Sequence, residues 1–76
     1  MITDKPNAVR GFITMYYGTY ENLAKVLNIA TGTVGTWAGT RPRGLLKYSP
    51  EICADCDIDA NLIVQVVRDH IKQGHV

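Results

Sequence analysis

Apolar residues recur every three or four positions along most of the chain, the spacing that places them on one face of an α-helix. Alternation of apolar and polar residues, which marks a half-buried strand, is absent from the sequence. The pattern predicts an all-α fold, a compact bundle of about five short helices built as one domain over residues 1–76. Helices are expected at residues 7–17, 19–27, 30–38, 49–57 and 60–73. A loop is expected over 39–48, where Pro42 and Gly44 act as helix breakers.

Residues with capping chemistry stand at the predicted helix ends. Asn7, Thr19, Ser49 and Asp59 can each accept a hydrogen bond from the first turn of the helix that follows. Gly18 and Gly74 stand where a helix would end in a left-handed residue. The boundaries therefore follow from capping as well as from periodicity.

Two short helices joined by a tight turn are expected over residues 19–38. Asn28 stands where the first helix must stop, and asparagine is the usual replacement for glycine in a left-handed turn. Such a pair describes a helix-turn-helix, whose second helix can enter a DNA major groove. The alternative is an ordinary helical hairpin within a bundle. The inner face of the pair is predicted to consist of Leu23, Ala24, Leu27, Val34 and Trp37.

The second helix of this pair would present glycine and threonine outward. Threonine hydroxyls can bond to base edges or phosphates, and threonine methyl groups can contact the thymine methyl. Glycines let the helix backbone approach a partner closely. The outward residues, and thus the candidate DNA contacts, are Thr31, Gly32, Thr33, Gly35 and Thr36.

Charge gives a mixed indication about the partner. The formal net charge is +1, a small excess for a protein that must displace counterions from DNA. Arg41, Arg43 and Lys47, however, fall within seven residues that contain no acid. They are candidate phosphate contacts beside the groove, and the alternative is a solvated basic loop.

The sequence contains no complete catalytic or metal-binding set. Cys53 and Cys56 have C-x-x-C spacing, but neither a second ligand pair nor a βαβ context accompanies them. One shared helix face favours two reduced thiols that pack in the core. His70 lies on the apolar side of the last helix and is interpreted as a packing residue. We expect no enzyme activity, no metal and no cofactor.

The last helix has a wider apolar face than packing against the rest of its own chain requires. This width suggests a homodimer through Ile63, Val64, Val67 and Ile71, since helix-turn-helix proteins gain affinity by pairing two recognition helices. The alternative is a helix sunk deeply into a small core.

The segment Leu23-Ala24-Lys25-Val26-Leu27-Asn28-Ile29, followed by Thr33-Val34-Gly35-Thr36-Trp37, resembles the helix-turn-helix of CI-type and Cro-like repressors of temperate bacteriophages. The resemblance covers roughly residues 19–57. It implies a lambda-repressor-like fold and a transcription regulator that binds a double-stranded DNA operator as a dimer. It also places Ala30, Thr31, Gly32, Gly35 and Thr36 at DNA-facing positions.

The same resemblance implies a location in the cytoplasm of a bacterial host. The first residues show no signal-peptide pattern, and no apolar run approaches the roughly 18 residues of a membrane span. We therefore expect no membrane contact.

Several residues depart from the family pattern. Ala30 stands where a serine caps the recognition helix, and Gly35-Thr36 stands where Ser-Asn is common. The outward face also lacks the Arg, Gln and Asn side chains that make bidentate base contacts. The missing bidentate side chains and the low net charge favour an alternative function, a protein-interaction module on a helix-turn-helix scaffold that binds a repressor or another regulator and has little affinity for DNA. The cations Arg41, Arg43 and Lys47 oppose this alternative.

Overall fold

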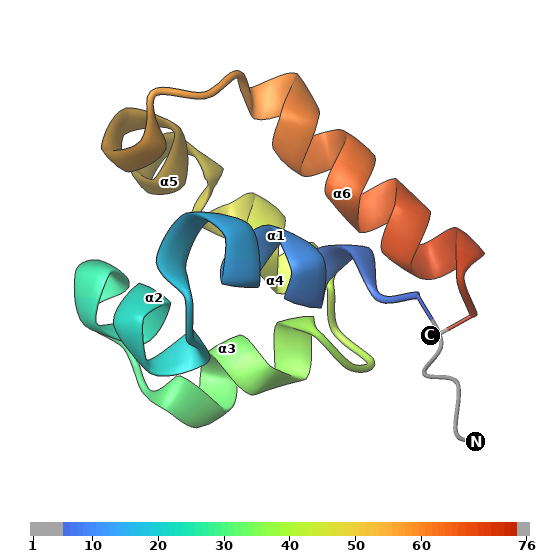
Figure 1. Cartoon of the computed structure of the whole chain (residues 1–76), viewed down its shortest axis with the longest axis horizontal. Helices are drawn as coiled ribbons and strands as arrows, with labels where there is room; N and C mark the ends of the chain where they lie inside the picture. Colours follow the sequence, from blue (N-terminus) through green and yellow to red (C-terminus); the bar gives the residue numbers. More distant parts are fainter. Residues whose placement is uncertain (1–5, 75–76) are drawn as a thin grey trace.

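The computed structural model describes residues 6–74, and every regular element in this range is an α-helix, which confirms the predicted all-α class. Residues 1–5 and 75–76 of the predicted domain lie outside the described range. The helices pack into one compact body, with α1 running across its middle (Figure 1). They are α1 (Ala8–Tyr17), α2 (Tyr20–Leu27), α3 (Thr31–Trp37), α4 (Arg43–Lys47), α5 (Ser49–Cys56) and α6 (Ala60–Lys72).

The predicted loop over 39–48 is wrong in part, because it contains α4, so the described residues form six helices. Pro42, interpreted from the sequence as a helix breaker, occupies the N-cap position of α4. A proline is tolerated at a helix start because its missing N–H would have had no partner inside the helix. Leu45, which is fully buried, fixes this short helix in the core.

The core lies between the helices, where α1 packs against α2 and α6 and where α4 contacts α3, α5 and α6 (Figure 1). The predicted inner face of α2 and α3 is confirmed, with Leu27 half-buried at its edge. Tyr16 is 38% exposed, because the apolar face of α1 turns toward Tyr17, which packs against the core. The buried apolar residues are Val9, Phe12, Ile13, Leu23, Ala24, Val34, Trp37, Leu45, Ile52, Ile63 and Val67.

Three predicted caps are confirmed. The side chains of Asn7, Thr19 and Asp59 each accept a hydrogen bond from a backbone N–H in the first turn of α1, α2 and α6, respectively. The predicted cap at Ser49 is wrong: α5 follows α4 so closely that Tyr48 stands between them and Ser49 is already helical. Capping chemistry thus identified the isolated helix starts and failed where two helices share a junction.

The chain reverses after α2 and α5 through left-handed residues that are not glycine. Asn28 has φ 56° and ψ 48°, as its position after α2 predicted. Asp57 adopts nearly the same conformation after α5, with φ 55° and ψ 50°. Asparagine and aspartate tolerate this region better than other residues with a side chain, so both turns are locally consistent with the sequence.

A chain of side-chain hydrogen bonds joins α1 to α5. The thiol of Cys56 donates to the hydroxyl oxygen of Tyr17 over 3.1 Å, and the Tyr17 hydroxyl donates to Asp55 over 2.9 Å. Burial, together with its contacts to Cys56 and Asp55, raises the pKa of the Tyr17 phenol above its ordinary value. Cys53 and Cys56 are both free and half-buried, so they pack at the margin of the core and not within it.

Candidate nucleic-acid interface

The turn between α2 and α3 is short and closed by backbone hydrogen bonds. The N–H of Ile29 donates to the carbonyl of Ala24 over 2.9 Å, across the left-handed Asn28. The next residue, Ala30, occupies the N-cap position of α3 and provides no side-chain cap. The second helix therefore starts without the hydrogen bond that stabilises the starts of α1 and α2.

Tertiary packing holds α3 in place. Val34 is fully buried, and Trp37 is only 3% exposed. The Trp37 ring also packs on the ring of Tyr48, with 5.4 Å between centroids. A methyl group built on Gly44 would overlap the indole of Trp37, so α4 approaches α3 at a distance that only glycine permits. The sequence marked Gly44 as a loop residue and gave no sign of this contact.

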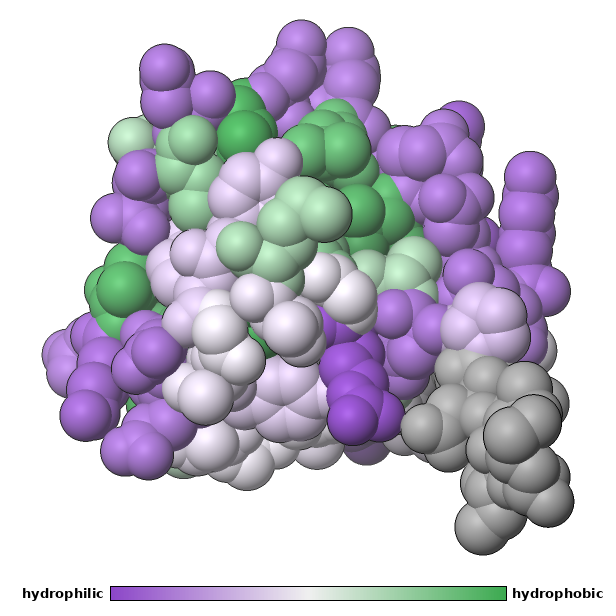
Figure 2. Space-filling view, in the orientation of Figure 1, coloured by the Kyte–Doolittle hydropathy of each residue, from purple (hydrophilic) through white to green (hydrophobic). Residues whose placement is uncertain are grey.

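The outward face of α3 has the composition that periodicity predicted. Thr31, Gly32, Thr33 and Thr36 are exposed, and Gly35 is half-buried. A methyl group built on Gly32 or Gly35 would meet no atom within 4 Å. Packing within the chain thus requires neither glycine. Figure 2 shows a pale surface over α3, at the lower middle of the view, where side chains are neither strongly hydrophilic nor strongly apolar.

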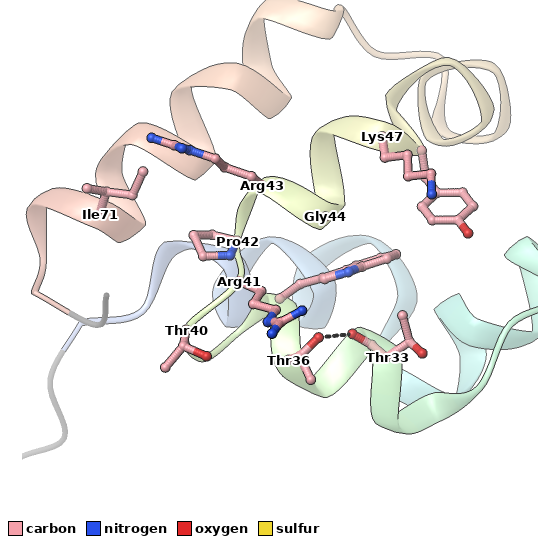
Figure 3. Close-up of a pocket in the computed structure, with 11 residues that line it drawn as sticks. Thr33, Thr36, Thr40, Arg41, Pro42, Arg43, Gly44, Lys47 and Ile71 are labelled. Carbon is pink, nitrogen blue, oxygen red and sulfur yellow. Dashed lines mark hydrogen bonds between the residues drawn. The ribbon is translucent and has the colours of Figure 1, made fainter.

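Two of these threonines and the three predicted cations line one hollow of about 840 Å³ between α3 and α4 (Figure 3). In Figure 3, Arg41 extends from the connecting loop toward Thr36, Arg43 extends toward α6, and Lys47 lies at the opposite end of α4. No acidic residue lines the hollow. Its lining consists of Thr33, Thr36, Trp37, Thr40, Arg41, Pro42, Arg43, Gly44, Lys47, Tyr48 and Ile71.

The cations of the hollow keep their charges available for a partner. Arg41, Arg43 and Lys47 are all exposed. Within residues 6–74 the ion pair that forms is elsewhere, between Lys25 and Glu21 on α2, with 3.6 Å between charged atoms. Placing three unpaired cations around one concave surface creates a local positive potential that the net charge of +1 conceals.

A buried polar group fixes the loop that carries Arg41. The amide of Asn7 donates to the carbonyl of Ala38 over 2.8 Å, and the ring nitrogens of His70 lie 2.8 Å from the Gly39 carbonyl and 3.0 Å from the Asn7 side-chain oxygen. These carbonyls follow the last turn of α3, where helix carbonyls lack partners within the helix. His70 is fully buried and hydrogen-bonded, which confirms its interpretation as a packing residue. Its link to the loop was not visible in the sequence.

The structure corrects the predicted dimer surface. Ile63 is fully buried and Val67 is 3% exposed, so their predicted place at an interface is wrong. Both contribute to the core, which accounts for the broad apolar face of α6. Val64 is half-buried, and Ile71, 38% exposed, lines the hollow.

The described part of the chain contains neither a metal-ligand cluster nor a membrane-spanning helix. No group of three or more His, Cys, Asp or Glu side chains within residues 6–74 could hold a metal ion. No helix in that range is long and apolar enough to cross a bilayer. Comparisons with family models, with curated proteins and with solved structures give no match to this chain.

Proposed function

We propose that this chain is a DNA-binding transcription regulator that places α3 in the major groove of an operator. Bound there, it would act by blocking or recruiting RNA polymerase. The single observation that carries the proposal is the hollow, which gathers Thr33 and Thr36 of α3 with Arg41, Arg43 and Lys47 on one surface free of acids. The helix would supply base contacts, and the cations would bind phosphates on the strand beside the groove.

The glycines of α3 support the same proposal. Gly32 and Gly35 each destabilise the helix by about 0.8–1.0 kcal/mol relative to alanine. No contact within the chain accounts for them, since a methyl group at either position would meet open space. A partner that approaches the helix backbone closely, such as the floor of a DNA groove, gives a physical reason for both.

The number of cations in the hollow determines how strongly DNA affinity should depend on salt concentration. Each phosphate neutralised changes the slope of log affinity against log salt by about 0.9. Three contacts would therefore weaken binding about 40-fold between 50 and 200 mM salt. This is a modest dependence, consistent with a small module whose full affinity comes from pairing two copies on one operator.

A second candidate function is a protein-interaction module. The lining of the hollow also includes the apolar side chains of Trp37, Pro42 and Ile71. An acidic peptide with apolar side chains would suit such a surface. This candidate makes the opposite prediction for nucleic acid, since duplex DNA would bind weakly even at low salt.

The decisive experiment is selection from a random-sequence duplex pool, followed by binding measurements across a salt series. The Arg43→Ala variant should bind more weakly and show a salt slope shallower by about one unit. Arg10→Ala is the matched control, because it removes the same charge from the outer face of α1, away from the hollow. If Arg43→Ala and Arg10→Ala lose the same slope, the chain binds DNA but the hollow is not its interface. If no duplex binds near 50 mM salt, the DNA function is wrong. Capture of an acidic peptide would then support the second candidate.

A further inference from the structure

The hydroxyl of Thr36 is already engaged inside α3. Its Oγ1 donates to the backbone carbonyl of Thr33 over 2.6 Å, a short hydrogen bond within one helical turn (Figure 3). A threonine hydroxyl has one proton and two lone pairs. With its proton committed, Thr36 can offer an outside partner only a lone pair and a methyl group.

This restriction decides which groups in a major groove Thr36 can contact. A lone pair can accept from the 6-amino group of adenine or the 4-amino group of cytosine, and the methyl group can pack on the thymine methyl. The N7 and O6 atoms of guanine are acceptors, as are phosphate oxygens, and these would face a lone pair with no proton between them. Thr36 is therefore unsuited to guanine and to the DNA backbone.

We propose that Thr36 is a specificity-determining residue that selects an A·T base pair. Only this pair presents both an amino donor and a methyl group in the major groove, so it matches both features that Thr36 exposes. The inference rests on the proposed DNA-binding function and adds the base pair that one residue reads. It also assigns a different role to the neighbouring cations, which hold phosphates and carry no sequence preference.

The remaining threonines of the hollow provide the contrast. Thr33 and Thr40 line the same surface, and neither side-chain hydroxyl forms a hydrogen bond within residues 6–74. Their protons remain free, so both can donate to phosphate oxygens. Thr40 follows α3 in the loop that carries Arg41, so loss of its hydroxyl should weaken binding to all duplexes alike and leave the base preference unchanged.

The test separates the two features of Thr36 by matched changes in protein and DNA. Thr36→Val removes the oxygen and keeps a methyl group, whereas Thr36→Ser keeps the oxygen and removes the methyl group. The preferred duplex is first selected with the wild-type chain, and the base pair read by Thr36 is located as the one whose preference changes in Thr36→Val. Thr40→Val is the control for a lost hydroxyl at the same surface.

At that base pair, the DNA is changed by single groups. Uracil in place of thymine removes the methyl group, and purine in place of adenine removes the amino group. Each change should weaken wild-type binding about threefold to tenfold, the range expected for one contact of this kind. Thr36→Ser should lose the response to uracil and keep the response to purine, and Thr36→Val should show the reverse.

Two results would overturn the inference while the DNA-binding function stands. One is a preferred G·C pair at this position, and the other is a base preference that neither Thr36 variant changes. Failure of the wild-type chain to select any duplex would instead refute the DNA-binding function itself, and the inference with it. Circular dichroism of each variant identifies any loss of binding that comes from loss of the fold.

Discussion

The first and third helices differ in the source of their stability. The first, α1, has ten residues, a side-chain cap from Asn7 and one exposed glycine. The third, α3, has seven residues, no side-chain cap and two glycines, and a methyl group added to either glycine would meet open space. Isolated helices of such length are marginal in water, and α3 is the weaker of the two by composition as well. Its stability must come from packing.

The comparison of α1 with α3 shows that the outer face of α3 lowers the stability of the fold. The inner face of α3 is secured by Val34 and Trp37, while its outer face consists of residues that weaken a helix. The two glycines alone account for about 2 kcal/mol relative to alanine, a sizeable share of the roughly 5–15 kcal/mol that stabilises a typical domain. Such a loss on an exposed face, with no compensation inside the chain, is typical of a surface shaped by a partner.

The largest effect should follow removal of the anchor of α3. Trp37→Ala would take a nearly fully buried ring from the core and from its contact with Tyr48, at a loss of about 3–5 kcal/mol in the free energy of unfolding. Urea denaturation measures this loss, and hydrogen exchange should show the amides of α3 losing protection before those of α1. As a control, Tyr16→Ala changes an aromatic residue that is 38% exposed and should lose much less. Equal losses in the two variants would contradict the assigned role of Trp37.

A smaller effect is expected at the contact between α4 and α3. Gly44→Ala forces a methyl group into the indole of Trp37, so the helices must separate, with a loss of about 1–3 kcal/mol. Gly11→Ala is the matched control, since the same change in the open space on α1 should be stabilising. Thermal unfolding of both variants shows directly whether each substitution stabilises or destabilises the fold. A stabilised Gly44→Ala variant would show that the close approach of α4 is not required.

The missing cap offers a way to make α3 more like α1. Ala30→Ser places a hydroxyl where it can accept from the first turn, and the expected gain is about 0.5–2 kcal/mol. The converse change, Asn7→Ala, removes the cap of α1 and its hydrogen bond to Ala38, and it should destabilise the fold by at least as much. Chemical denaturation of both variants checks the prediction, and an unchanged midpoint for Ala30→Ser would count against it.

The sequence predicted the elements that depend on local chemistry. Periodicity and caps located α1, α2, α3 and α6 within a residue or two, and the left-handed turn at Asn28 followed from its position after Leu27. The sequence missed α4, because a five-residue helix has no full apolar period and its N-cap residue, Pro42, reads as a breaker. Such a helix exists only because Leu45 is buried by distant parts of the chain.

The sequence likewise predicted only part of the candidate site. The outward residues of α3 and the three cations could be named from periodicity and charge. Their gathering around one hollow could not, because it depends on the approach of Gly44 to Trp37 and on the loop that His70 holds. The apolar residues Ile63 and Val67 were misplaced at a dimer surface for a related reason. Periodicity shows that a face is apolar but does not show whether the chain itself covers it.

The smallest effect on stability provides the sharpest test of the comparison. Gly32→Ala and Gly11→Ala make the same change at two exposed helical positions with open space around them, and each should stabilise the fold by up to about 1 kcal/mol. If the outer face of α3 is shaped by DNA, the two variants must differ in binding.

Gly32→Ala should bind its selected duplex more weakly despite its greater stability, because the added methyl group holds the helix backbone away from the groove. Gly11→Ala should bind as the wild-type chain does. Measurement of both quantities on the same preparations separates stability from function, and a Gly32→Ala variant that gains stability without losing affinity would leave the glycines of α3 without a role in binding.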